Sequence, residues 1–180
     1  MVLTYNECVE QFNGLSKFKR ALAEGKVHKL EKGYYSDQKY EPEMAVISRK
    51  YPNAILTLNS AFYYHGLTDT IPDYYYMATD KDSAKIKDCR IVQSFDNSGQ
   101  LMLGAEISQV EGASVLMYNK ERLLIEAVRN RNRLPFEYYK EIINNYRDII
   151  YELDIQAIQE YAEKLPKTAL VTKTLEMEVL

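Results

Sequence analysis

Six lysine and arginine residues fall between Lys17 and Lys32, together with His28, and their type and spacing point more directly to a function than any other residues do. Cations grouped in this way bind nucleic-acid phosphates, which supplies affinity and register. Sequence reading requires side chains that reach base edges, and a recognition helix offers its N-terminal part to the major groove. The predicted DNA-binding residues are Ser16, Lys17, Lys19, Arg20, Lys26, His28, Lys29 and Lys32. A solvated charged face is the alternative that this pattern leaves open.

The distribution of charge favours the N-terminal part of the chain as the region that contacts DNA. The 180 residues carry a net charge of −3, which argues against a uniformly basic nucleic-acid binder. Residues 1–40 contain seven basic and five acidic side chains, a net charge of +2, whereas the remainder contains 16 basic and 21 acidic side chains, a net charge of −5. A basic head on an acidic body indicates that the head makes any nucleic-acid contact.

Two carboxylates, Asp80 and Asp82, have the alternating spacing with which nucleotidyltransferases hold magnesium. The rest of such a site is missing, because no Gly-Ser phosphate-binding turn precedes them and no strand with a third carboxylate is evident. The sequence also contains no nucleophile elbow, Walker loop, dinucleotide-binding glycine pattern or HExxH motif. We therefore expect a surface turn at Asp80, and a protein without catalytic residues, metal or cofactor.

The stretch YPNAILTLNSAFYYHGLTD, which begins at Tyr51, contains His65 in the last turn of a predicted helix. Ala54 to Leu58 read as a short buried strand, Asn59 or Ser60 as the cap of the helix that follows, and Gly66 as its end. An imidazole at a helix C-terminus can hydrogen-bond to free carbonyls, so a structural role is expected for His65, with catalysis as the alternative.

The head is predicted to be a winged helix-turn-helix. Thr4 and Glu7 have the spacing of a capping box for a helix ending near Phe12, with Leu3 and Cys8 as its hydrophobic staple. After the turn at Asn13-Gly14, Ser16 is expected to cap a second helix that buries Leu15, Phe18 and Leu22 and ends at Gly25. Residues 26–37 are expected to form a hairpin with its turn at Lys32-Gly33.

The body, residues 41–180, is predicted to be an α+β domain that ends in helices. A helix over EMAVISRKY precedes two or three strands, near Tyr74–Ala78, Arg90–Phe95 and Ala113–Tyr118, with turns at 97–99 and 111–112. The helices that follow begin at Asn119, Pro135 and Asp154, and Pro166 separates the last one from its predecessor. The residues expected to be buried in the helix from Pro135 are Phe136, Tyr139, Ile142, Ile143, Tyr146 and Ile150. Arg129, Arg131 and Arg133 are expected to satisfy carbonyls at a helix end, with phosphate or partner binding as the alternative.

Cysteine usage and hydropathy indicate a cytoplasmic protein. The only two cysteines, Cys8 and Cys89, lie far apart, which is typical of reduced thiols and not of a disulfide framework or a zinc site. No apolar run approaches the length needed to cross a bilayer, and no signal-peptide region precedes Thr4.

Three segments taken together resemble the AbiEi family, antitoxins of the type IV abortive-infection toxin-antitoxin systems. They are GKVHKLEKGYYSD, KYPNAILTLNSAFYYHGLTDTIP and MYNKERLLIEAVRNRNRL, and their order and spacing cover nearly the whole chain. The shared features are a wing that ends in Gly-x-Tyr, a strand-helix unit that closes on His65-Gly66-Leu67, and Glu121-Arg122 at the start of the C-terminal helices.

The resemblance implies a transcriptional repressor of its own operon that also counteracts a nucleotidyltransferase toxin encoded beside it. Its expected partners are operator DNA with inverted repeats and the toxin, without a stable protein complex, and no membrane. The competing hypothesis is a non-catalytic protein-interaction module with a vestigial DNA-binding head. A nucleotidyltransferase or nuclease is a more distant third.

Overall fold

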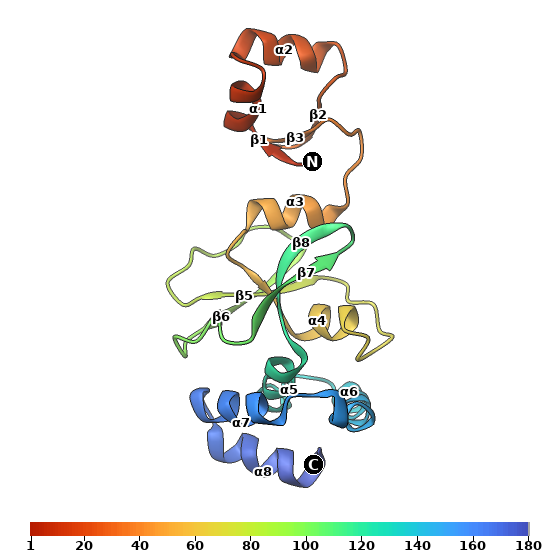
Figure 1. Cartoon of the computed structure of the whole chain (residues 1–180), viewed down its shortest axis with the longest axis vertical. Helices are drawn as coiled ribbons and strands as arrows, with labels where there is room; N and C mark the ends of the chain where they lie inside the picture. Colours follow the sequence, from red (N-terminus) through yellow and green to blue (C-terminus); the bar gives the residue numbers. More distant parts are fainter. Residues whose placement is uncertain (180) are drawn as a thin grey trace. The chain divides into compact units, whose positions relative to one another are not determined.

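Two units are separated by their internal contacts in the computed structural model, which describes residues 1–179 (Figure 1). Residues 1–52 and 109–115 form the first unit, and residues 53–108 together with those from 116 onward form the second. The described chain contains helices and two separate β-sheets, so the predicted α+β class is confirmed. The predicted division of the chain after residue 40 remains a prediction.

The first unit contains a small three-stranded sheet with two helices inserted between its first and second strands. Its elements are β1 (Leu3–Thr4), α1 (Tyr5–Gln11), α2 (Leu15–Ala23), β2 (His28–Glu31), β3 (Tyr34–Ser36) and α3 (Glu43–Lys50). The strand order is β1-β3-β2, and both pairings are antiparallel. The hairpin β2–β3 with its turn at Lys32-Gly33 agrees with the prediction, whereas the two-residue strand β1 is too short for a sequence pattern to reveal.

Aromatic and small apolar side chains from both helices and the hairpin form the core beneath α1 and α2. Cys8, Phe18, Ala21, Val27 and Tyr35 are buried together, and Leu3 packs against them, which confirms its predicted staple with Cys8. The rings of Phe18 and Tyr35 meet edge to face at a centroid distance of 5.1 Å. This core fixes α2 against the hairpin that follows it.

The first helix begins as predicted and the second does not. The Thr4 hydroxyl accepts a hydrogen bond from the Glu7 amide, and the Glu7 carboxylate accepts one from the Thr4 amide at 2.7 Å, so the capping box is confirmed. In α2, however, the residue before the first turn is Gly14, at φ +127°, and Ser16 lies inside the helix without a capping role. Gly14 can adopt this backbone conformation because it lacks a Cβ atom, so the helix starts directly from the turn. Leu15 is consequently 40 % exposed and does not join the core.

The second unit is built on a five-stranded sheet and a group of C-terminal helices. Its elements are β4 (Ile55–Leu56), α4 (Leu58–Tyr64), β5 (Tyr75–Asp80), β6 (Ile91–Asp96), β7 (Ala105–Val110), β8 (Ala113–Tyr118), α5 (Lys120–Arg129), α6 (Phe136–Asp148), the 3-10 helix η1 (Ile150–Glu152), α7 (Ile155–Lys164) and α8 (Thr168–Glu178). The strand order is β6-β5-β4-β8-β7, and the tip of the β7–β8 hairpin belongs to the first unit. In Figure 1 the helices α5 to α8 gather together after the last strand.

The pairing within this sheet places several polar residues on one face. Strands β5 and β6 run parallel, with Tyr76 opposite Val92 and Ala78 opposite Ser94. Because alternate side chains of a strand point to the same face, Tyr76 and Ala78 share a face with Val92, Ser94 and Asp96. That face is the one that lines the cavity described below.

Three local expectations for the body differ from the structure. Strand β7 is absent from the predicted sheet because it is an edge strand whose Ile107 is 76 % exposed, so it lacks a buried apolar face. Helix α4 begins at Leu58, not after Asn59 or Ser60, and its N-cap residue, Thr57, makes no side-chain capping hydrogen bond. Phe136 is 70 % exposed, because it occupies the first position of α6, ahead of the buried face that starts at Tyr139.

The predicted starts of the last helices are confirmed. The Asn119 side chain accepts a hydrogen bond from the Arg122 amide at 2.9 Å, and the Asp154 carboxylate accepts one from the Ala157 amide at 3.0 Å. Pro166 lies between α7 and α8. No helix in the part of the chain that the structure describes has the length and apolar character of a membrane span.

Candidate functional site

The predicted DNA-binding residues lie on α2, on β2 and in the turns that flank β2. Within α2, Ser16 and Arg20 are one helical turn apart and lie on the side opposite the buried Phe18. Lys17 and Lys19 lie at the two edges of that exposed side. The shared core of Phe18, Val27 and Tyr35 holds this face of α2 and the β2–β3 hairpin in one unit.

Two of the predicted cations already pair with a carboxylate of the head. Glu24, the C-cap of α2, accepts from Arg20 Nε at 2.6 Å and from Lys26 Nζ at 2.7 Å. Hydrogen bonds from Lys26 and Arg20 hold the pKa of Glu24 below its ordinary value. The Arg20 side chain is nevertheless 80 % exposed, so salt and water screen this pair and a phosphate can compete with it.

The other predicted residues are more accessible. Lys17, Lys19, Lys29 and Lys32 are all exposed, and none of their ammonium groups has a hydrogen-bond or ion-pair partner among residues 1–179. Ser16 is exposed as well, whereas His28 is half-buried and pairs with Ser36 in the antiparallel ladder. The head therefore presents unpaired ammonium groups to solvent from both α2 and the hairpin.

Asp80 and Asp82 form a turn at the end of β5. The Asp80 carboxylate accepts a hydrogen bond from the Asp82 amide at 2.9 Å, and Asp82 is exposed. This side-chain-to-backbone hydrogen bond is that of an Asx-turn. Among the described residues, no group of three or more histidine, cysteine, aspartate or glutamate side chains has a geometry suited to a metal ion.

His65 is the C-cap of α4, and its ring bridges to the end of a strand. Its Nε2 lies 2.8 Å from the Tyr118 carbonyl oxygen, which can only accept, so the neutral ring carries its proton on Nε2. Burial lowers the pKa of His65, and it outweighs the opposing effect of the Tyr118 hydrogen bond. This geometry assigns the imidazole a structural contact between α4 and β8.

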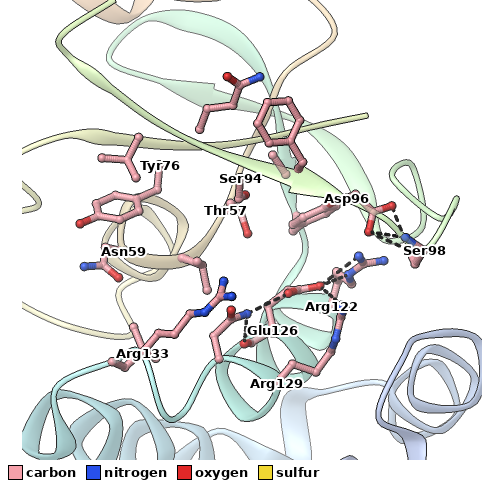
Figure 2. Close-up of a pocket in the computed structure, with 18 of the residues that line it drawn as sticks. Thr57, Asn59, Tyr76, Ser94, Asp96, Ser98, Arg122, Glu126, Arg129 and Arg133 are labelled. Atoms are coloured by element: carbon pink, nitrogen blue, oxygen red, sulfur yellow. Dashed lines mark hydrogen bonds and ion pairs between the residues drawn. The ribbon is translucent and has the colours of Figure 1, made fainter. Parts of the chain in front are cut away.

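A cavity of about 820 Å³ opens within the second unit, and sequence reasoning did not identify it. One wall is the face of β5 and β6 that carries Tyr76 and Ser94, with Thr57 and Asn59 at the junction of β4 and α4. The opposite wall is α5 and the turn after it, and the segment between α7 and α8 contributes Lys167. In Figure 2 the side chains of both walls converge on this space.

Helix α5 presents a charged stripe to the cavity. Glu126, Arg129 and Arg133 follow Arg122 by four, seven and eleven residues, a spacing that keeps them on one side of the helix and its extension. The positions between them are occupied by buried apolar side chains, among them Leu123, Leu124 and Val128. The stripe is therefore a polar wall on a helix that is otherwise part of the core.

Arg122 is almost completely buried, and every part of its guanidinium has a partner. Its Nε donates to Glu126 at 3.0 Å, and its Nη1 donates to the carbonyls of Gln100 and Leu103 at 3.1 and 3.2 Å. The guanidinium also stacks on the Tyr118 ring at 4.6 Å. These contacts satisfy a charge that would otherwise be costly to bury, so Arg122 is a structural member of the wall.

Two polar atoms of the wall are buried without a hydrogen-bond partner in the described structure, the Nε of Arg129 and the Oδ1 of Asn59. Arg129 uses its Nη1 to donate to Glu126 at 2.7 Å. Arg133 is exposed, and its guanidinium has no partner among the described residues. Figure 2 shows its side chain extending into the space between Asn59 and Glu126. Arg133 thus offers an unpaired guanidinium to the cavity.

The arginine spacing was the available signal for this wall. The pattern RLLIEAVRNRNR places charges at regular helical intervals within an apolar run, which indicates a charged stripe that is not solvated. The sequence pattern predicts Arg129, Arg131 and Arg133 as one group at a helix end. The structure separates them, because Arg129 and Arg133 line the cavity while Arg131 lies 3.9 Å from Glu178 outside it.

Comparison with protein-family models gives no match, and no curated protein matches the chain. What the protein does is therefore inferred from its own residues and from the resemblance of its motifs.

Proposed function

We propose that the protein is an antitoxin of the AbiEi type that represses its own operon by binding operator DNA through the head. In this proposal the head is a winged helix-turn-helix in which α2 is the recognition helix and β2–β3 is the wing. The body, with no catalytic residue, takes part in counteracting a nucleotidyltransferase toxin encoded beside the gene.

The order of elements in the first unit supports the winged-helix part of the proposal. A winged helix-turn-helix places a hairpin directly after its recognition helix, and here the hairpin β2–β3 follows α2 after four residues, 24–27. The second strand of the hairpin also pairs with β1, which precedes both helices. A sheet of order β1-β3-β2 anchors the wing to the start of the helix pair.

The observation that carries DNA binding is the set of unpaired, exposed ammonium groups on α2 and the hairpin. Lys17 and Lys19 come from the helix, and Lys29 and Lys32 come from the hairpin, all exposed and without partners among the described residues. Phosphate contacts from a helix and a wing together fix the orientation of the helix in the major groove. Ser16 and Arg20, on the exposed side of α2, are then positioned to reach base edges.

The test of DNA binding is a gel-shift titration of the full chain on DNA from upstream of its own coding sequence, repeated over a salt series. Lys29→Ala should weaken binding to operator and random DNA alike and flatten the slope of log affinity against log salt by about 0.9. Arg20→Ala should cost roughly 1 to 3 kcal/mol on the operator and much less on random DNA.

Lys85→Ala is the matched control, because Lys85 is an exposed lysine of the second unit. It should leave both affinities and the salt slope unchanged. Equal affinities and slopes for the wild type, Lys29→Ala and Arg20→Ala would remove DNA binding from the head and favour the protein-interaction module instead.

The antitoxin part of the proposal needs its own test. Co-expression with the neighbouring gene product should restore growth that the toxin alone arrests, and Lys29→Ala should still rescue if neutralisation resides in the body. Affinity purification of the tagged chain should recover no stoichiometric toxin. Failure to restore growth, with normal expression of both proteins, would contradict the antitoxin assignment.

A further inference from the structure

We propose that the cavity of the second unit is a binding site for a small nucleoside phosphate, with Arg129, Arg133 and Lys167 receiving the phosphate groups and the Asn59 side receiving the base. This inference concerns a site other than the head and does not depend on the proposed operator binding.

The charge balance of the cavity favours an anion. Four cationic side chains and two carboxylates line it, and both carboxylates are already occupied. Glu126 accepts from Arg122 and Arg129 and also from the Asn130 amide. Asp96 accepts from the Ser98 hydroxyl at 2.7 Å and from the Gln100 amide at 3.1 Å. With both carboxylates engaged inside the wall, the cationic excess of the cavity is left for a ligand.

The donors that remain free are suited to phosphate oxygens. The Nε of Arg129 is buried and unpaired, although Glu126 fixes the guanidinium through Nη1. Arg133 points into the cavity and has no partner among the described residues. Lys167 Nζ donates to the Arg129 carbonyl at 2.8 Å, which holds its ammonium group beside the C-terminal end of α5. Guanidinium groups bind phosphate through two parallel N–H donors, so two arginines and a lysine make a receptor for a phosphate chain.

The part of the cavity that Asn59 lines differs in chemistry. Asn59 presents a buried carbonyl oxygen that lacks a donor. The Tyr76 ring lies beside it in Figure 2. A nucleobase offers N–H donors at its edge and a flat apolar face, and these complement an amide oxygen and an aromatic ring. A simple anion would leave this side of the cavity unused.

The size of the cavity agrees with this ligand class. Small-molecule and cofactor sites have volumes of roughly 300 to 1,000 Å³ and combine apolar walls with a few converging polar groups. The volume here is about 820 Å³, and Ala78, Val92 and Pro135 supply apolar wall. The side chains that converge on it come from separate elements of one unit, so the cavity is built by the fold itself.

Isothermal titration of the full chain with the four ribonucleoside triphosphates, adenosine and inorganic pyrophosphate tests the proposal. At least one triphosphate should bind saturably, and adenosine should bind much more weakly. Arg133→Ala should weaken the triphosphate by about tenfold or more, because a charged hydrogen bond is lost. Arg133→Lys should recover only part of that loss, because a lysine keeps the charge but not the fork of donors.

Two matched variants report on specificity. Arg131→Ala removes the same charge two residues away, outside the cavity, and should leave binding unchanged. Lys29→Ala, in the head, should also leave it unchanged, which separates this site from the DNA-binding surface. Melting temperatures measured for every variant establish that each one folds.

Asn59→Ala distinguishes recognition of the base from binding of the phosphate groups. It should weaken the triphosphate and leave pyrophosphate unaffected. Equal affinity for pyrophosphate and triphosphate, with Asn59→Ala silent, would overturn the nucleoside part. Three other outcomes would each overturn the site as proposed. They are the absence of saturable binding by any triphosphate, an Arg133→Ala variant that binds as the wild type does, and displacement of the nucleotide by a single-stranded RNA oligomer of higher affinity.

Discussion

A glutamate that pairs with an arginine four residues before it and with a second basic side chain occurs twice in this chain, once exposed to solvent and once buried. In the head, Glu24 pairs with Arg20, four residues before it, and with Lys26. In the second unit, Glu126 pairs with Arg122, four residues before it, and with Arg129. The side chains of Arg20 and Glu24 are 80 % and 35 % exposed, whereas those of Arg122 and Glu126 are 1 % and 12 % exposed.

Burial gives the two arrangements different physical consequences. An exposed ion pair contributes little because water and salt screen it and two long side chains lose freedom. A buried pair is also a poor source of net stability, but removal of one partner leaves the other charge desolvated and alone. The exposed triad, Arg20, Glu24 and Lys26, is therefore available to an external phosphate. The buried triad, Arg122, Glu126 and Arg129, is part of the structure and shapes the cavity.

The largest effect is expected when the buried triad is broken. Glu126→Ala leaves the guanidinium of Arg122 buried without its carboxylate, and we expect a loss of about 3 kcal/mol in the free energy of unfolding, as for other buried pairs deprived of one partner. Urea unfolding followed by circular dichroism measures it. Glu24→Ala is the matched control and should show no measurable change in the same experiment. Similar unfolding curves for both variants would mean that burial does not distinguish the two triads.

The second effect tests how closely the backbone packs against the buried triad. Gly104 has φ +72°, and a Cβ atom there would lie 2.6 Å from Arg122 Cβ and 2.9 Å from Asn119 Oδ1. Gly104→Ala should therefore combine backbone strain with a steric clash and lower the free energy of unfolding by about 2 kcal/mol or more.

Gly99 supplies the control for that variant. It has the same φ of +72°, but open space surrounds the position of its Cβ atom. Gly99→Ala carries the backbone strain alone, so the difference in melting temperature between the two variants reports the packing against Arg122. Equal melting temperatures would show that the loop moves away from Arg122 without cost.

Sequence patterns predicted the local features that depend on neighbouring residues. The Thr4-Glu7 capping box, the Asn119 and Asp154 caps and the Lys32-Gly33 turn all arise from interactions within a few residues. The cavity could not be found in this way, because Asn59, Ser94 and Arg133 meet only through the pairing order of the sheet. The Arg-Glu pairs of the two triads have one spacing, and only the residues between the charges, Ala-Leu-Ala in one and Leu-Leu-Ile in the other, indicate which pair is buried.

Mutation of the exposed triad should change the affinity for DNA, although it should not change the free energy of unfolding. Glu24→Gln removes the carboxylate that competes for Arg20 and Lys26. We expect tighter binding to both operator and random DNA, and a salt slope steeper by about 0.9 for each phosphate contact that the released cations add. Gel shifts over a salt series measure both quantities. An unchanged slope would place Lys26 away from the DNA backbone, whereas Arg20 is proposed to reach a base edge. Glu126→Gln should leave the slope unchanged, since its partners lie in the wall of the cavity.

The smallest expected effect extends the comparison to a partly buried group, His65. Burial lowers the pKa of its imidazole below the ordinary value of 6.5, while Lys120 acts in the same direction and Glu106 and Glu121 oppose it. A pKa that is lower in the folded state means that the unfolded chain binds the proton more readily. The stabilising contribution of the neutral ring is therefore complete above pH 6.5 and is lost as the pH falls through the folded-state value.

His65→Gln isolates this contribution, because the amide can still donate to the Tyr118 carbonyl but does not titrate. The free energy of unfolding of the wild type should decline below pH 6.5 more steeply than that of the variant, and the two should run parallel above it. Carboxylates also titrate in acid, but Glu7, whose pKa the Arg49 hydrogen bond lowers to about 2, loses its contribution only at much lower pH. Parallel curves over the whole range would show that protonated His65 fits the folded state as well as neutral His65 does. Burial would then have no more effect on this imidazole than on the exposed charges of the head.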